Sequence, residues 1–174
     1  LNFGEPGRGH QGDWTRGIDE ARPIFEAAIE SGLFYFDTAD IYGVGACEEV
    51  VGQLLRELLP RDQYVINTKV AMPMGRGANQ GGLSRKHIIE GVDSSLLRLG
   101  LEYVDQLIIH RHAHAIRGAS AGPIEETLEA LNDVVKAGKA IHIGASSMFA
   151  WQFAELQLTA TINDWNHTVS MQNH

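Results

Sequence analysis

Residues 33–43 read L-F-Y-F-D-T-A-D-I-Y-G, an apolar run that stops at Asp37. Three later apolar runs also end at a polar residue, namely Lys69, His110 and Gln172. Amphipathic helical stretches separate the runs, and strands that alternate with helices predict a parallel sheet. In a barrel of such units the carboxyl ends of the strands form one face, and that face carries the active site. An acid, a cation, a histidine and an amide at these positions therefore indicate a functional site.

The same pattern, followed along the chain, predicts five strands joined by helices. Helix signals include Ser84 as an N-cap, Pro123 in a first turn and Gly100 as a stop. Strands are expected over residues 33–37, 64–69, 103–109, 140–144 and 168–172. Helices are expected over residues 19–31 and 48–59, from Ser84 to Gly100, from Pro123 to Gly138, and over residues 149–160. A stub of one further strand is expected at residues 1–3.

This strand count bears on the architecture. A closed barrel has eight strands and roughly 250 residues, whereas this chain has 174 residues and starts at Leu1 without a methionine. We therefore expect one incomplete α/β barrel domain over residues 1–174, covering about strands 2–6 with a stub of strand 1. Periodicity alone also allows an open doubly wound sheet, so that alternative stays open at this point.

Composition narrows the class of protein. The formal charge is −8 with no basic cluster, which argues against nucleic acid as a partner. No apolar run approaches membrane-spanning length, so no membrane partner is expected. The single cysteine, Cys47, cannot form an internal disulfide, and this favours a reducing, cytoplasmic location.

Five short motifs follow the predicted strands in a recognisable order. They are F-D-T-A-D-I-Y-G at 36–43, N-T-K at 67–69, L-I-I-H-R at 107–111, I-G-A-S-S at 143–147 and S-M-Q-N at 170–173. Together they resemble the aldo-keto reductase superfamily over nearly the whole chain. The similarity is greatest to bacterial and fungal members that reduce aldehydes or oxidise alcohols with NADP(H). The resemblance implies a (β/α)8 TIM barrel and an oxidoreductase that acts on a small aldehyde, ketone or alcohol.

The resemblance also implies four catalytic residues. Tyr42 would be the general acid that protonates the carbonyl oxygen as hydride arrives. Lys69 would lower the pKa of Tyr42, and Asp37 would hold Lys69. His110 would orient the substrate carbonyl and donate to its oxygen. No metal is required by this chemistry.

Three further residues would contact the cofactor in a member of this superfamily. Ser146, Ser147 and Gln172 would hydrogen-bond the nicotinamide carboxamide and so fix which ring face meets the substrate. The chain departs from the family at Ser147, where asparagine is usual, and serine has a shorter reach. A preference for NADP(H) over NAD(H) follows from the resemblance only, and the substrate is not determined by these residues.

Two other classes of function remain open. Alternating histidines at His110, His112 and His114 could bind a divalent metal, as in metal-dependent hydrolases built on barrels. A partial barrel could also be catalytically inactive and serve as a binding or accessory protein. In either case, two open sheet edges would favour self-association.

Overall fold

The structure is a computed structural model that describes residues 3–9, 14–112 and 122–173. Helices and strands alternate along the chain. The helices are α1 (Ile18–Glu30), α2 (Ala46–Leu58), α3 (Arg85–Leu99), α4 (Ile124–Lys136) and α5 (Ala150–Asn163), with a short 3-10 turn, η1 (Arg61–Gln63). The strands are β1 (Tyr35–Asp37), β2 (Val65–Val70), β3 (Val104–Ile109), β4 (Ala140–Ser146) and β5 (Thr168–Gln172). The five predicted strands and their helices are thus confirmed, with boundaries shifted by a few residues.

The five strands form one parallel sheet in the order β1-β2-β3-β4-β5. Each strand pairs with the next one along the chain, so the strand order never reverses. A doubly wound sheet would reverse its order at a switch point. The curled sheet is therefore part of a (β/α)8 barrel, and the open-sheet alternative is excluded for the described strands.

The helix ends follow the local sequence signals. The Ser84 hydroxyl accepts a hydrogen bond from the backbone N–H of His87 at 3.2 Å, which caps the first turn of α3. Gly100 ends the same helix with a φ angle of +65°, a conformation that glycine adopts without strain. In α4, Glu125 and Glu126 place negative charge at the positive end of the helix.

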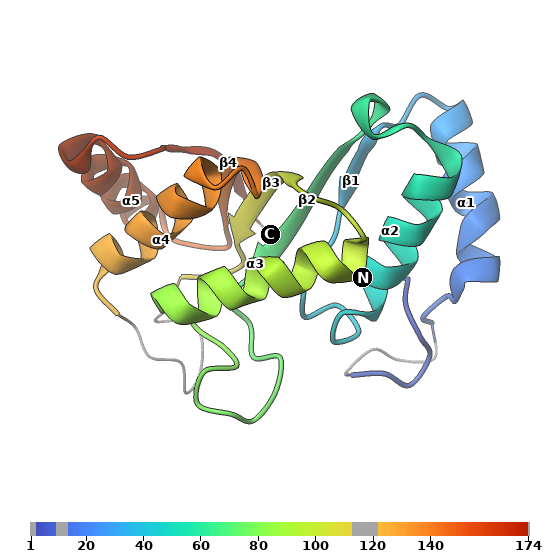
Figure 1. Ribbon diagram of the computed structural model, residues 1–174, viewed down its shortest axis with the longest axis horizontal. Helices are drawn as coiled ribbons and strands as arrows, with labels where there is room; N and C mark the ends of the chain where they lie inside the picture. Colours follow the sequence, from blue (N-terminus) through green and yellow to red (C-terminus); the bar gives the residue numbers. More distant parts are fainter. Residues whose placement is uncertain (1–2, 10–13, 113–121, 174) are drawn as a thin grey trace.

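The helices lie along one side of the sheet in chain order, from α1 to α5 (Figure 1). Their apolar faces and the outward-facing strand residues enclose the main core, which includes Leu54, Ile66, Ile88, Leu107 and Leu131. Helices α2 and α3 approach closely at Gly52, where an added Cβ atom would collide with the backbone of Leu99.

Polar side chains cross the other face of the sheet. The Tyr35 hydroxyl donates to Gln106 Oε1 at 3.4 Å, and Gln106 Nε2 donates to Ser170 Oγ at 2.6 Å. Gly144 lies beneath this chain of contacts, and a Cβ atom there would press on both Gln106 and Ser170. These bonds join β1, β3 and β5 across the inside of the curled sheet.

The amino-terminal expectations are only partly met. Strand β1 is shorter than expected, and Leu33 and Tyr35 are about 60% exposed because an edge strand is covered on fewer sides. Phe3 pairs with Arg16 in an isolated bridge instead of joining the sheet, and its ring packs edge-on against Phe25 at 5.2 Å. Residues 1–2 of the expected stub lie outside the described residues.

Candidate active site

Three of the predicted site residues meet at the carboxyl ends of neighbouring strands. Asp37 is the last residue of β1, Lys69 is the last but one of β2, and His110 directly follows β3. The strand register places Lys69 beside Ile108, and the backbone N–H of His110 donates to the Val70 carbonyl at 2.9 Å. Parallel pairing therefore brings an acid, a cation and an imidazole to one edge.

Lys69 and Asp37 form a close ion pair. The Lys69 Nζ atom lies 2.7 Å from both carboxylate oxygens of Asp37 and donates to the Thr38 carbonyl at 2.8 Å. Lys69 is 1% exposed. Burial lowers the pKa of Lys69 from its ordinary value, while the hydrogen bond and charge of Asp37 act in the opposite direction. The ammonium is thus fixed by three oxygen acceptors.

Asp37 also binds two amide side chains. Asn67 Nδ2 donates to Asp37 Oδ1, and Gln172 Nε2 donates to the same oxygen at 3.2 Å. Asn67 and Thr38 were not among the predicted site residues. The signal for Asn67 was its place two residues before Lys69, because alternate residues of a strand face the same side.

Tyr42 lies in the loop between β1 and α2. Its ring centroid is 5.1 Å from the Lys69 Nζ atom and 5.6 Å from the His110 ring, which meets it edge-on at 81°. Two backbone hydrogen bonds hold the residue, from the Tyr42 N–H to the Ala39 carbonyl and from the Cys47 N–H to the Tyr42 carbonyl. The structure therefore places the phenol ring close to both the cation and the imidazole.

The acidity of Tyr42 differs from the expectation. Burial, and then the charge of Asp37, raises the pKa of Tyr42 to about 12, while Arg111 acts in the opposite direction. Lys69 was expected to lower this pKa. Instead, the ammonium lies over the ring and its charge is balanced by the two oxygens of Asp37, so burial dominates.

His110 is held as a neutral imidazole near pH 7. Burial, with the charges of Lys69 and Arg111, lowers its pKa from 6.5 to about 4. A neutral imidazole carries one N–H donor and one acceptor nitrogen. Its Nδ1 atom is buried and makes no hydrogen bond with the residues that the structure describes. One nitrogen of the ring is therefore left without a hydrogen-bond partner among these residues.

The three residues expected to contact a cofactor lie at the ends of β4 and β5. Ser146 pairs with Gln172 in the strand register, and the Ser147 N–H donates to the Gln172 carbonyl at 3.1 Å. The two serine hydroxyl oxygens are 3.3 Å apart. Ser147 has a φ angle of +48°, which turns the chain sharply at the strand end. The strand register thus brings the hydroxyls of Ser146 and Ser147 to the same end of the sheet as the amide of Gln172.

This donor set fits a carboxamide. A carboxamide presents one carbonyl acceptor and two N–H donors, and hydroxyl and amide side chains can satisfy both kinds. Gln172 is joined to the catalytic candidates directly, because its amide donates to Asp37, whose partner Lys69 lies over the Tyr42 ring. The residues present are therefore compatible with a nicotinamide group beside Tyr42.

The alternating histidines His110, His112 and His114 were considered as metal ligands. The ring of His112 lies 6.3 Å from that of Trp151, and His114 lies outside the described residues. Within residues 3–9, 14–112 and 122–173, no group of three or more His, Cys, Asp or Glu side chains is placed to hold a metal ion.

In the same ranges, no helix has the length and apolar character needed to cross a bilayer.

Comparison with known proteins gives a consistent family. The profile described as "Aldo/keto reductase family" matches residues 8–173. The versiconal hemiacetal acetate reductase of Aspergillus parasiticus is 42% identical over 92% of this chain and 50% of its own length. A putative aryl-alcohol dehydrogenase of Schizosaccharomyces pombe is 40% identical over 100% of this chain and 58% of its own length.

An aldo-keto reductase of Alternaria alternata is 38% identical over 93% of this chain and 49% of its own length. The chain thus spans about half the length of the curated relatives that it matches. The family profile covers the strand ends, the loop that carries Tyr42 and the serine pair after β4. The chain therefore belongs to the aldo/keto reductase family.

Proposed function

We propose that this chain carries the catalytic site of an NADP(H)-dependent oxidoreductase that reduces aldehydes or ketones to alcohols, or catalyses the reverse reaction. One observation carries the proposal: the Tyr42 ring lies close to both the Lys69 ammonium and the His110 imidazole, with Asp37 bound to Lys69. Family membership supports the same class of chemistry.

Tyr42 would act as the general acid. With its pKa raised to about 12, the phenol keeps its proton at neutral pH. It can then donate that proton to a carbonyl oxygen as negative charge develops there. In the direction of oxidation, the phenolate form of Tyr42 would accept the alcohol proton.

Lys69 and Asp37 would provide a fixed pair of opposite charges beside the Tyr42 phenol. The Lys69 ammonium lies over the ring and stabilises it electrostatically, as cations over aromatic faces do. Asp37 neutralises the buried ammonium and keeps it in one place. The pair thus gives Tyr42 a fixed environment that needs little rearrangement during proton transfer.

His110 would orient the substrate. Because its pKa is lowered to about 4, the imidazole is neutral and can donate a single hydrogen bond. A donor aimed at the carbonyl oxygen stabilises the charge that develops there without competing with Tyr42 as the acid. We therefore assign carbonyl orientation to His110 and protonation to Tyr42.

NADP(H), when bound, would supply or accept the hydride. Ser146, Ser147 and Gln172 would hold the nicotinamide carboxamide, and their hydroxyl and amide groups match its donors and acceptors. The choice of NADP(H) over NAD(H) rests on the family resemblance, so both cofactors belong in any assay. A reducing, cytoplasmic setting would suit the lone, buried Cys47.

The class of substrate is suggested by the relatives. One is named as an aryl-alcohol dehydrogenase and another as the reductase of a hemiacetal acetate. We propose a reactive aromatic aldehyde as the first substrate to test.

The test follows NADPH consumption by the purified chain with an aromatic aldehyde. Tyr42→Phe removes the proton donor and should lower turnover by about 100-fold or more, while NADPH binding measured by fluorescence stays unchanged. Tyr103→Phe is the matched control, since Tyr103 precedes β3 at the opposite end of the strand. Full activity in Tyr42→Phe would remove Tyr42 as the acid. Absence of turnover in the unmodified chain would show that these residues alone do not make a working enzyme.

A further inference from the structure

Glu48 is a fully buried carboxylate outside the proposed catalytic set. It lies in the first turn of α2 and its side chain is 0% exposed. A charged group without access to water is strongly destabilising unless it is paired and hydrogen-bonded. Its partners therefore show what the residue connects.

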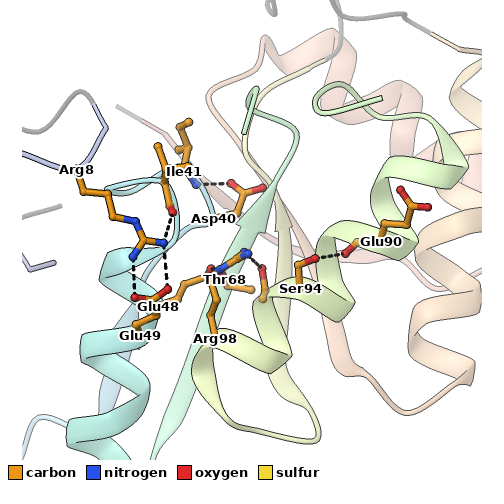
Figure 2. Close-up of polar contacts among 11 residues, drawn as sticks. Arg8, Asp40, Ile41, Glu48, Glu49, Thr68, Glu90, Ser94 and Arg98 are labelled. Carbon is orange, nitrogen blue, oxygen red and sulfur yellow. Dashed lines mark hydrogen bonds and ion pairs between the residues drawn. The ribbon is translucent and has the colours of Figure 1, made fainter. Parts of the chain in front are cut away.

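Both oxygens of Glu48 are bound, and by different elements. Thr68 Oγ1, on β2, donates to Oε1 at 2.5 Å, and Arg98 Nε, on α3, donates to Oε2 at 2.6 Å (Figure 2). Arg98 in turn donates to Ser95 Oγ at 3.1 Å. The carboxylate thus joins the strand that carries Lys69 to the two helices behind it.

The position of Thr68 makes this contact significant for the site. Thr68 stands between Asn67 and Lys69, and both of these neighbours bind Asp37. Successive side chains of a strand face opposite sides. Strand β2 is therefore bound on its inner side by Asp37 and on its helix side by Glu48, within three consecutive residues.

Glu48 is also connected to the loop that carries Tyr42. The N–H of Cys47, its neighbour, donates to the Tyr42 carbonyl at 3.2 Å. Gly45, earlier in the same loop, lies so close to the Arg98 side chain that an added Cβ atom would collide with it. The partner of Glu48 thus packs directly against the loop between Tyr42 and α2.

Asp40 adds a second link between this loop and β2. Its backbone N–H donates to the Lys69 carbonyl at 3.2 Å, and its side chain is 1% exposed. Burial and the charge of Glu48 raise the pKa of Asp40 well above its usual range, while Arg98 and Lys69 act in the opposite direction. The loop is thus joined to β2 through Asp40 as well as through Glu48.

We propose that Glu48 is a positioning residue that, through Thr68 and Arg98, fixes the placement of Tyr42 relative to Lys69. The proposal rests on the proposed function, because it gives this placement a catalytic consequence. Glu48 contacts neither of the two residues through its own side chain. It acts through β2 on one side and through the start of α2 on the other.

An ionic contact suits this role better than an apolar one. Replacing a buried ion pair by packed apolar groups often leaves stability unchanged, so such a pair is weak evidence for a purely stabilising role. Two short, directional bonds from different elements define a geometry that apolar packing does not define. A displacement of about 1 Å at a catalytic group can lower turnover by about 100-fold.

The test uses three substitutions of this contact and one control. Thr68→Val removes the donor to Glu48 with little change in shape, and Thr68→Ser keeps it. Glu48→Gln removes the charge. Glu57→Gln is the control, because Glu57 is on the same helix, is 42% exposed and binds Arg22 of α1 at 2.5 Å.

The first measurement does not need activity. The ionisation of Tyr42 is followed by ultraviolet difference spectroscopy up to about pH 11, with the same variant carrying Tyr42→Phe as the blank. In the unmodified chain, with a Tyr42 pKa of about 12, little of this phenol should ionise in that range. Thr68→Val and Glu48→Gln should loosen the loop, admit water and move the Tyr42 pKa toward about 10. Thr68→Ser and Glu57→Gln should titrate like the unmodified chain.

The second measurement is turnover with NADPH and an aromatic aldehyde. Thr68→Val and Glu48→Gln should lower kcat by about 10- to 100-fold while the KM for NADPH changes less than about twofold. A lower melting temperature with unchanged Tyr42 ionisation would overturn the proposal and leave Glu48 a structural role only. If the unmodified chain shows no turnover, the proposed function fails for this chain, and the titration alone still decides whether Glu48 positions Tyr42. Should Glu48→Gln not fold, the pair Thr68→Val and Thr68→Ser gives the answer.

Discussion

The Lys69 Nζ atom lies 2.7 Å from each carboxylate oxygen of Asp37, but the two side chains differ sharply in exposure. The Lys69 side chain is 1% exposed, whereas that of Asp37 is 33% exposed. The buried Lys69 ammonium therefore depends on Asp37 to neutralise its charge, while Asp37 also has access to water. The ion pair is for this reason more important to the folded state than an ordinary surface pair.

Asp37→Asn should destabilise the fold. The substitution leaves the Lys69 ammonium buried without a counter-charge, and loss of one partner of a buried pair costs about 3 kcal/mol. Urea denaturation followed by circular dichroism measures the change in the free energy of unfolding. The control is Asp93→Asn, since Asp93 binds Lys139 at 2.5 Å with half of its side chain exposed. That change should cost less than about 1 kcal/mol. Equal losses in the two variants would contradict the importance of the buried pair.

His110 should make stability fall in mild acid. Its pKa is about 4 in the folded chain, below the ordinary value of 6.5, so the unfolded chain binds more protons between these values. The contribution of His110 to the free energy of unfolding is therefore fully present above about pH 6.5. It is lost as the pH decreases toward 4, and the loss from this residue is up to about 3 kcal/mol. His87, whose pKa is also lowered by burial, adds to the same trend.

The contribution of His110 is measured by comparison with His110→Gln. The free energy of unfolding of both proteins is determined at pH 7 and at about pH 4.5. The variant should lose less stability between the two pH values, because glutamine does not titrate. Identical pH dependence in the two proteins would show that the imidazole is not held neutral by its surroundings.

Gly52→Ala should destabilise the contact between α2 and α3. Alanine ordinarily favours a helix over glycine by about 1 kcal/mol. Here the new methyl group would collide with the backbone of Leu99, so the two helices must separate. We expect a net loss of about 2 kcal/mol in the free energy of unfolding. Gln53→Ala, at the exposed neighbouring position, should change stability by less than about 0.5 kcal/mol, and a stabilised Gly52→Ala variant would refute the close approach.

The two edges of the sheet should make the chain self-associate. Among the described strands, β1 and β5 are each paired on one side only, and Val169 on β5 is 59% exposed. A strand edge whose backbone groups are unpaired and that carries apolar side chains favours edge-to-edge association. Sedimentation velocity should therefore show a weight-average mass that rises with concentration, and Val169→Lys should reduce that rise. A compact monomer that melts cooperatively at all concentrations would contradict this expectation.

The sequence predicted the architecture well because its signals were local. Apolar runs that end at Asp37, Lys69 and His110 reflect strands whose carboxyl ends meet, and the structure places all three together. Ser84 and Gly100 bracket α3 as their side chain and backbone preferences predict. Such features depend on residues near one another in the chain.

Other features depend on distant parts of the chain and were not predicted. Burial raises the pKa of Tyr42, and this burial depends on how the whole loop packs. Exposure of Tyr35 follows from its place on an edge strand, which the apolar run alone does not reveal. The contact between Glu48 and Thr68 joins residues 20 positions apart, and no local pattern indicates it.

The hydrogen bond from Gln172 to Asp37 has a consequence for the order of folding. It joins residues 135 positions apart, on the last and the first strand of the sheet. During synthesis a chain emerges from its amino terminus, so Asp37 is available long before Gln172. Strands β1 to β4 can pair before the Gln172 amide has been synthesised, and Asp37 gains this hydrogen bond only when β5 docks. A chain truncated before residue 168 should therefore hold Lys69 and Tyr42 in a folded setting in which Asp37 lacks the Gln172 amide.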